Sequence, residues 1–328
     1  MRVSVIIPTY NRADLLPATL ASIRAQTLPP AEIIVVDDGS TDATPALLAA
    51  APDLRPIRVR NGGDLVARNI GLAAATSPYV AFCDSDDLWR PEFLATMAEF
   101  WKAEPGLRAA YGDFVIVRDD TWLTESKFAG APEGFWDGLR PVGAVGGVFD
   151  HPIFPRLLDY QPFFTSCLVA DREWLRSIGG WDVSVGRLLA GDFATALRLA
   201  AHAPLGILRA PLVGIRKHAR NISGNDRATA LGEVLVLERV LETNPAAAQH
   251  EEAVRATIAQ RRAQTLDSAF VDGDFQAVRE IFDALPPAYR RGRVRVKHAV
   301  ARLPPGPRQA LARTLLAVGS ATAKWLKR

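Results

Sequence analysis

Short apolar runs alternate with stretches of helical periodicity over the first hundred residues of the chain. Runs rich in β-branched residues predict strands at 3–7, 32–36, 56–60 and 79–83. Helices are predicted between them, near 14–25, 42–50 and 63–75. This alternation is typical of a mostly parallel central sheet flanked by helices, so we expect an α/β, Rossmann-like fold.

The pattern changes twice further along the chain. A helix and a strand are predicted next, at 91–103 and 108–117. Residues 118–161 then lose their periodicity and are rich in Gly, Pro and aromatic residues, which is typical of a functional loop region. Strand and helix signals return between 162 and 210, and after about residue 224 the chain is rich in Ala and Leu without alternation. We therefore expect an α/β domain at 1–223 and a helical C-terminal appendage at 224–328.

Length and composition narrow the class of protein. The 328 residues suffice for one large domain with an appendage, and no run approaches the ~18 to 20 apolar residues that a membrane span needs. The first apolar run has only five residues before Pro8, unlike a secretory signal, so we expect a cytoplasmic location. Cys83 and Cys167 lie in apolar runs without metal-ligand spacing, and we expect both to be reduced core residues.

Positive charge is concentrated at the C-terminal end. Residues 285–328 contain eleven Lys or Arg and no Asp or Glu, whereas the rest of the chain carries a net charge of −8. On a helical wheel of 308–327, Leu311 and Trp325 share an apolar face opposite Arg313. This basic amphipathic helix is equally compatible with binding to an anionic membrane surface, which would make the protein peripheral, and with packing on the protein's own helices. No nucleic acid is expected as a partner, because the segment lacks interleaved stacking aromatics.

Polar and turn-forming residues follow the predicted strands of the first hundred residues. Because ligands of such sheets bind beyond the carboxyl ends of the strands, we expect these residues to share one edge. Asp84, Asp86 and Asp87 directly follow the strand at 79–83. Asp84 and Asp86 are suited to hold one Mg²⁺ or Mn²⁺ that keeps positions open for phosphate oxygens. Solvated turn residues, with Asp87 as a helix cap, would explain the local pattern equally well.

A second acidic pair, Asp37 and Asp38, ends the strand at 32–36. Either carboxylate is suited to accept hydrogen bonds from a base or a ribose, and Gly39 permits a close approach of the backbone. A polar turn with a helix cap would give the same local pattern. Two such clusters at neighbouring strand ends favour a shared ligand.

Three segments together resemble family 2 of the inverting glycosyltransferases, which have the nucleotide-diphospho-sugar transferase (GT-A) fold. They are VSVIIPTYNR, IIVVDDGSTD and ARNIGLAAATSPYVAFCDSDDLW, with weaker similarity in IGGWD, GDFATALRLA and RKHARNIS. The resemblance covers about residues 1–223 and implies a donor half at about 1–117 and an acceptor half at about 118–223.

The activity that this resemblance implies is a metal-dependent, inverting transfer of a sugar from a nucleotide-diphospho-sugar. A UDP-sugar is favoured as donor over a GDP- or dTDP-sugar. The acceptor would be a saccharide, lipid-linked or other hydroxyl compound, in cell-surface glycan or glycolipid synthesis.

The resemblance also implies roles for individual residues. The nucleotide-sugar would be bound by Pro8, Thr9, Tyr10, Arg12, Asp37, Asp38, Arg68, Asp84, Ser85 and Asp86. Pro8, Thr9 and Tyr10 would frame the base, Asp38 would contact a uracil-type edge or the ribose, and Arg68 would face the nucleotide or the diphosphate. Asp84 and Asp86 match the family's Asp-x-Asp motif and, with His218, would hold Mn²⁺ or Mg²⁺. Simpler interpretations remain open: Arg68 as a surface helix residue, Tyr10 packed against the following helix, and His218 as a surface or structural residue.

The resemblance places the catalytic base less directly. Inverting transfer needs a carboxylate that removes the proton of the acceptor hydroxyl. Asp192, at the start of the predicted helix after GGWD, matches the family's aspartate. Gly191 and Ala194 depart from the family pattern, in which acidic residues are common at both positions. Asp192 as a simple N-cap, and Asp182 as the base in its place, remain alternatives.

Other classes of protein compete with this interpretation. The missing acids at 191 and 194 would fit a non-catalytic sugar-nucleotide-binding module that the basic end recruits to a membrane. A nucleotidyltransferase should have a Gly-rich loop after the first strand, where PTYNR stands, and is disfavoured. The sequence also lacks the Gln-x-x-Arg-Trp motif of processive members, which argues against a synthase that extrudes polysaccharide.

Overall fold

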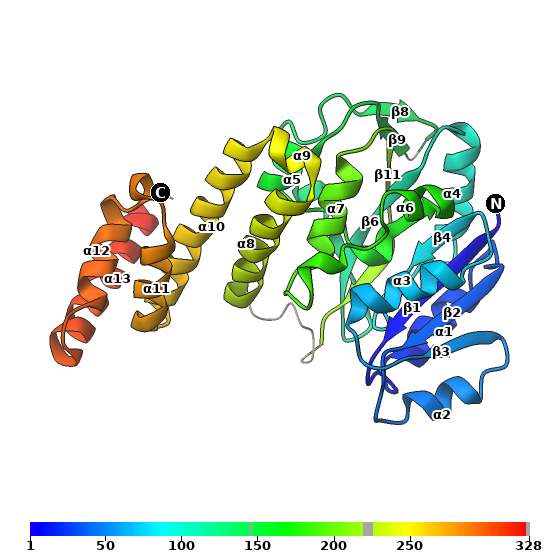
Figure 1. The fold of residues 1–328 in the computed structure, drawn as a ribbon, viewed down its shortest axis with the longest axis horizontal. Helices are drawn as coiled ribbons and strands as arrows, with labels where there is room; N and C mark the ends of the chain where they lie inside the picture. The colour runs from blue at the N-terminus through cyan, green and yellow to red at the C-terminus, as the bar shows by residue number, and fades with distance from the viewer. Residues whose placement is uncertain (145, 219–225, 326–328) are drawn as a thin grey trace. The chain divides into compact units, whose positions relative to one another are not determined.

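The chain divides into two compact units, Met1–Asn221 and Ile222–Arg328 (Figure 1). The structure is a computed structural model that describes residues 1–144, 146–218 and 226–325. The first unit is built on a β-sheet with helices packed against it, and the second unit is helical.

A single mixed sheet forms the centre of the first unit (Figure 1). Its strands are β1 Val3–Thr9, β2 Glu32–Asp37, β3 Leu54–Arg58, β4 Tyr79–Phe82, β5 Leu88–Trp89, β6 Ala109–Arg118, β7 Thr121–Ser126, β8 Arg140–Val142, β9 Gly146–Phe149, β10 Leu168–Asp171 and β11 Leu205–Arg216. Their order is β3-β2-β1-β4-β10-β6-β11-β9-β8, with β5 beside β11 and β7 beside β6. The first four strands are mutually parallel, and β6 is parallel to β11. The α/β fold with a mostly parallel central sheet is therefore confirmed.

Helices connect these strands and cover the sheet. They are α1 Leu16–Arg24, α2 Thr44–Ala49, α3 Asp64–Ala74, α4 Phe93–Ala103, α5 Phe154–Asp159, α6 Arg172–Ser177 and α7 Asp192–Ala200, with short 3₁₀ turns η1 Phe128–Gly130, η2 Thr165–Cys167 and η3 Val183–Val185. Each helix and strand predicted in the first 117 residues is found with its ends shifted by a few residues. The chain steps from β1 to β2 after α1 and from β3 to β4 after α3, and these two steps run in opposite directions across the sheet. Because such crossovers are right-handed, α1 and α3 lie on opposite faces of the sheet.

The contact between α3 and the sheet is unusually close. β1 is buried along its whole length, as expected for a parallel strand covered on both faces. Gly71 of α3 lies against this strand, and a Cβ atom built there would be only 2.4 Å from Cγ2 of Ile6. Glycine is thus required for α3 to lie at this depth, which fixes the height of the helix that carries Arg68.

The expectation of an irregular stretch at 118–161 was wrong. This region contains β7, β8, β9 and α5, and β9 pairs with β11 as part of the sheet. The strands contain glycine and proline, such as Pro141 and the pair at 146–147, which hide the usual strand pattern. Gly147 has a physical reason, since a Cβ atom there would come within 2.7 Å of the Leu139 side chain.

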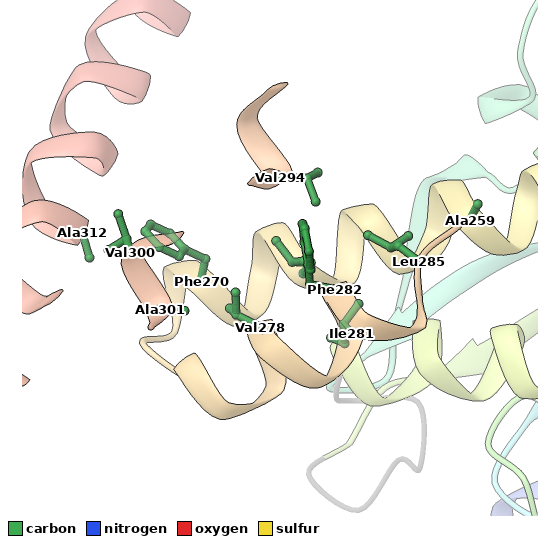
Figure 2. Packing of buried hydrophobic residues seen from close by; sticks show 12 residues of the cluster. Ala259, Phe270, Val278, Ile281, Phe282, Leu285, Val294, Val300, Ala301 and Ala312 are labelled. Atoms are coloured by element: carbon green, nitrogen blue, oxygen red, sulfur yellow. The ribbon is translucent and has the colours of Figure 1, made fainter. Parts of the chain in front are cut away.

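The second unit consists of helices that share a small apolar core. They are α8 Asp226–Thr243, α9 Pro245–Gln249, α10 Glu251–Val271, α11 Phe275–Ala284, α12 Gly292–Ala301 and α13 Pro305–Trp325, with the 3₁₀ turn η5 Pro287–Tyr289. Figure 2 shows Phe270, Val278, Phe282 and other buried residues that join α10, α11 and α12. The basic segment after residue 285 is therefore built into a folded unit through its apolar side chains.

The C-terminal helix α13 is formed as predicted, but only part of its amphipathic face can be described. Ala312 is buried, and Leu315 and Leu316 pack against the apolar core. Leu311, predicted on the apolar face, is 46% exposed. The side chain of Trp325 lies outside the described residues. Within the described ranges, no helix is long and apolar enough to cross a bilayer.

Candidate active site

Residues that follow β1, β2 and β4 meet at the carboxyl edge of the sheet. β1 lies between β2 and β4, and the chain leaves β1 toward β2 but returns from β3 to β4 on the other side. Ligands of open α/β sheets bind where the strand order reverses in this way. Thr9 is the register partner of Asp37, and Asp84 lies just beyond β4, so the predicted site segments share this edge.

Arg68 of α3 connects several of these segments. Its guanidinium donates a 2.8 Å hydrogen bond to Asp84, pairs with Asp64, and lies 4.7 Å from the ring centre of Trp181. Only 4% of Arg68 is exposed, so the interpretation of Arg68 as a surface helix residue is wrong. Burial raises the pKa of Asp84 above its usual range, and Arg68 opposes this increase.

Asp86 faces a different set of partners from Asp84. Its Oδ2 lies 3.0 Å from Nε2 of His218 and 3.5 Å from Nε of Arg12. Carboxylate oxygens and imidazole nitrogens are both ligands of divalent metal ions, so Asp86 and His218 fit such an ion as two neighbouring ligands. His218 is accordingly part of the candidate site.

The predicted three-ligand set of Asp84, Asp86 and His218 is not formed. Across the described residues, no three His, Cys, Asp or Glu side chains are grouped in a way that could hold a metal ion. Asp84 instead accepts a hydrogen bond from Arg68, and the local sequence pattern does not reveal this contact.

The remaining two residues of the loop at 84–87 are buried. Asp87 accepts hydrogen bonds from the Ser166 hydroxyl and from the backbone N–H of Arg216. It is therefore neither a solvated turn residue nor a helix cap, since α4 begins six residues later. Ser85 is buried, and its carbonyl oxygen accepts a 3.0 Å hydrogen bond from the Thr19 hydroxyl.

The acidic pair after β2 organises the loops along the same edge. Asp38 accepts hydrogen bonds of 2.7 and 2.9 Å from the two backbone N–H groups at 62–63. Oδ1 of Asp37 accepts from the N–H of Ser40. Its Oδ2 is buried 3.6 Å from Nε of Arg58 and has no hydrogen-bond partner among the described residues. A carboxylate has about four lone-pair sites, so both residues retain capacity to accept further bonds.

The segment after β1 presents one exposed aromatic ring. Pro8 and Thr9 are buried at the end of the strand. Tyr10 is 46% exposed, so much of its side chain is accessible to a ligand. Asn11 has a positive φ of 52°, and its side-chain oxygen accepts from the N–H of Thr41, which ties this turn to the loop after β2.

Asp192 is the first residue of α7, and Gly191 is the N-cap. The alternative that Asp192 serves as the N-cap is therefore wrong. Burial raises the pKa of Asp192 to about 6, with Arg68 lowering it and the carboxylates of Asp64 and Asp84 raising it further. These interactions mean that Asp192 lies within electrostatic reach of the Arg68–Asp84 pair, with a pKa suited to a general base near neutral pH.

The absence of an acid at position 191 has a steric explanation. A Cβ atom at Gly191 would lie 3.1 Å from Cδ1 of Leu65 and 3.2 Å from the carbonyl oxygen of Leu188. A glutamate would crowd these neighbours. Ala194 is fully buried in α7, so an acid there would have to be desolvated.

Asp182, the alternative base, has a structural role. Its side chain pairs with Arg198 at 2.7 Å and accepts from the N–H and hydroxyl of Ser184. Only 5% of Asp182 is exposed. These contacts hold the turn that precedes α7.

A pair of hydrogen bonds between Asn69 and Trp181, which we call the clamp, was not predicted. The Asn69 side chain accepts from the backbone N–H of Trp181 at 2.9 Å and donates to its carbonyl at 2.8 Å. The two residues are 112 positions apart, so no local pattern could reveal the contact. The GGWD turn was the only signal, and the clamp attaches it to the helix that carries Arg68.

Solved structures with a similar arrangement of helices and strands define the fold class. Over 92% of this chain and 89% of the other, it superposes on S. aureus TarS 1–349 in complex with UDP-GlcNAc, with a TM-score of 0.60 and 18% identity. It also superposes on the mannosyltransferase PcManGT from Pyrobaculum calidifontis in complex with GDP-Man and Mn²⁺, over 92% and 84% of the chains, with a TM-score of 0.50 and 24% identity. The fold is that of GT-A glycosyltransferases.

Comparison of sequences points to the same class of enzyme. Residues 4–127 match the family model Glycosyl transferase family 2, so this segment is similar to the glycosyltransferases of that family. The succinoglycan biosynthesis protein ExoO of Rhizobium meliloti is 44% identical over 138 residues, 40% of this chain and 39% of that protein. The Escherichia coli protein UDP-Glc:alpha-D-GlcNAc-diphosphoundecaprenol beta-1,3-glucosyltransferase WfaP is 35% identical over 134 residues, 40% of this chain and 52% of that protein. The chain thus matches about half or less of the length of these relatives.

Proposed function

We propose that this protein transfers a sugar from a nucleotide-diphospho-sugar to a hydroxyl acceptor, with inversion at the anomeric carbon, in cell-surface glycan or glycolipid synthesis. The observation that carries the proposal is Asp192, a carboxylate with a pKa of about 6 within reach of the Arg68–Asp84 pair. A non-catalytic nucleotide-sugar module would have no need of such a group at the acceptor side of the site.

The nucleotide is proposed to bind along the edge formed by β1 and β2. Tyr10 offers an exposed ring for the base, and Asp37 and Asp38 offer acceptor oxygens for the base or the ribose. The diphosphate would lie toward Asp84, Ser85 and Asp86, with the Arg12 side chain nearby to balance its charge. The UDP-GlcNAc in the TarS complex and the UDP-Glc in the name of WfaP support a UDP-sugar as donor.

Asp86 and His218 are the residues proposed to hold Mn²⁺ or Mg²⁺, and the Mn²⁺ in the PcManGT complex supports a divalent ion. A bound divalent cation would neutralise charge on the diphosphate leaving group. Arg68 would hold the carboxylate of Asp84 beside the pair formed by Asp86 and His218.

Asp192 is proposed as the general base. It would remove the proton of the acceptor hydroxyl as that oxygen bonds to the anomeric carbon, while the bond from this carbon to the diphosphate oxygen breaks. The nucleoside diphosphate leaves with the electron pair of that bond. Because attack and departure occur on opposite faces of the sugar, the configuration inverts.

The protein is also proposed to contact an anionic membrane surface through its second unit. Arg291, Arg295 and Arg302 are exposed at and along α12, and helical geometry puts them within about 40° of one another around the helix. Within the described part of the chain, none of the three has an ion pair or a hydrogen-bonded side chain, in contrast to Arg293 and Lys297, which pair with Asp267. Each basic side chain near an anionic bilayer contributes about 1 kcal/mol of attraction.

A lipid-linked acceptor is compatible with this surface, and the diphosphoundecaprenol in the name of WfaP supports one. The participation of ExoO in succinoglycan biosynthesis supports a role in cell-surface polysaccharide synthesis.

A thermal-shift screen tests the proposed function. UDP, GDP and dTDP, each with and without Mn²⁺, should be compared, because ligand that binds the native state raises Tm according to its occupancy. We expect a Mn²⁺-dependent shift with UDP, and release of UDP from a UDP-sugar once a suitable acceptor is present. No shift with any nucleotide would contradict the proposal, and binding without turnover on saccharide and lipid-linked acceptors would favour the non-catalytic module.

A further inference from the structure

Asp87 lies at the centre of a buried hydrogen-bond network that joins three segments of the first unit. Its Oδ2 accepts a 2.5 Å hydrogen bond from the hydroxyl of Ser166 in η2. The hydroxyl oxygen of Ser166 in turn accepts a 2.9 Å hydrogen bond from the backbone N–H of Asp84. Oδ1 of Asp87 accepts from the N–H of Arg216, the last residue of β11, at 3.1 Å. One carboxylate thereby connects the loop at 84–87, η2 and the end of β11.

The end of β11 is tied to the same loop a second time. The guanidinium of Arg216 donates to the carbonyl of Asp86, and it also donates to the carbonyl of Leu15 at 2.8 Å and to the hydroxyl of Thr19 at 2.9 Å. Thr19 then donates to the carbonyl of Ser85. Hydrogen bonds within the protein thus fix the backbone around Asp86.

This arrangement bears directly on His218. Arg216 is two residues before His218, and Nε2 of His218 lies 3.0 Å from Oδ2 of Asp86. Asp86 and His218 are 132 positions apart in the sequence, so their separation depends on the contacts between the loop and the end of β11. Asp87, one residue from Asp86, makes one of these contacts with its side chain.

We propose that Asp87 is a positioning residue that sets the distance between Asp86 and His218, and thereby the affinity of the protein for a divalent cation and the diphosphate of the donor. This inference rests on the proposed function. Asp87 itself is only 5% exposed, with both carboxylate oxygens occupied, so its effect is exerted through the backbone of Asp84 and Arg216. Residues that orient metal ligands typically change metal affinity by about 10- to 100-fold when mutated.

The test is Mn²⁺ binding, measured by loss of the free-ion electron paramagnetic resonance signal, with the full chain and with UDP present or absent. Asp87→Asn keeps the side-chain volume but replaces one acceptor oxygen by a donor. We expect it to weaken Mn²⁺ binding in the presence of UDP by about 10- to 100-fold. Ser166→Ala, which removes the link to Asp84 while leaving the carboxylate and β11 in place, should have an intermediate effect.

A matched control is Asp113→Asn. Asp113 is a buried carboxylate in β6, 2% exposed, that accepts from the backbone N–H groups of Phe114 and Phe128. Its network contains none of the proposed ligands, so this variant should lose stability yet bind Mn²⁺ as tightly as the native protein.

The outcomes separate the two proposals. Equal Mn²⁺ affinity of the native and Asp87→Asn proteins overturns the positioning role and leaves the proposed function standing, as does equal weakening by Asp113→Asn. If the native chain binds no Mn²⁺ with UDP, both proposals fail. At saturating Mn²⁺, the Asp87→Asn variant should recover most of its kcat while its apparent KM for Mn²⁺ stays raised, a split that simple loss of folded protein would not produce.

Discussion

Arg68 donates a 2.8 Å hydrogen bond to Asp84, and the two residues join the third helix of the chain to the loop after its fourth strand. The same guanidinium lowers the pKa of Asp192, which burial raises to about 6. One buried cation therefore acts on a carboxylate of the proposed donor site and on the proposed base.

Asp192→Asn should abolish transfer and preserve donor binding. The amide cannot take the acceptor proton, so kcat should fall by about 10²- to 10⁴-fold, while the Tm increase with UDP and Mn²⁺ stays as in the native protein. Asp182→Asn is the comparison, because Asp182 pairs with Arg198 and should affect stability more than the chemical step. Transfer by Asp192→Asn at the native rate would show that the base lies elsewhere.

The activity should depend on pH through Asp192. Its carboxylate form is lost as pH falls through about 6, so kcat/KM should decrease toward tenfold per pH unit below that value. Arg68→Gln removes a charge that lowers this pKa and should shift the acidic limb to higher pH. Asp64→Asn removes a charge that raises it and should shift the limb to lower pH. Shifts in the same direction for both variants would contradict the assignment.

Asp86→Asn and His218→Ala should each weaken binding of Mn²⁺ with UDP, because each removes one of the two side chains proposed to hold the ion. We expect the Mn²⁺-dependent part of the Tm increase with UDP to be lost in both variants. His202→Ala serves as the control, since His202 is exposed and contacts Trp174. A native-like response in the His218 variant would remove His218 from the site.

Charge reversal on α12 should release the protein from anionic vesicles. The double variant Arg295→Glu, Arg302→Glu should bind phosphatidylglycerol vesicles at least tenfold more weakly than the native protein, because attractive charges become repulsive. Arg176→Glu with Arg255→Glu makes the same change in net charge at exposed helix positions elsewhere and should bind normally. Equal loss in both variants would indicate net charge alone, and no binding of the native protein would refute the membrane contact.

Asn69→Ala should destabilise the first unit. It leaves the N–H and carbonyl of Trp181 without their partner, at a cost of about 2 to 4 kcal/mol in the free energy of unfolding. Urea denaturation measures this directly. A change below about 0.5 kcal/mol would show that water or a shifted backbone replaces the clamp.

The parallel half of the fold was predictable because each strand is short, apolar and bounded by turn residues. The runs at 3–7, 32–36 and 79–83 are buried on both faces, so their hydrophobicity is continuous and needs no knowledge of distant contacts. β5 and β9 were missed for the opposite reason. Their strand state depends on pairing with β11, which lies more than fifty positions away.

The candidate site shows the same limit. The carboxylates after β2 and β4 were identified from their positions at strand ends, but their partners were not. Asp87 was interpreted as a turn or cap residue because Ser166, 79 positions away, is invisible to a local pattern. The sequence placed Asp84 at a metal site, which stays a prediction, and nothing in the sequence indicates that Arg68 binds its carboxylate.

The close approach at Gly71 has a consequence for any attempt to redesign this protein. A methyl group there would have to displace Ile6 in the middle of the sheet or push α3 outward, and α3 carries both Arg68 and Asn69. Only glycine therefore fits at this position, which faces Ile6 and Val36 of the sheet. Libraries intended to change sugar preference should hold residue 71 constant and vary the loops instead.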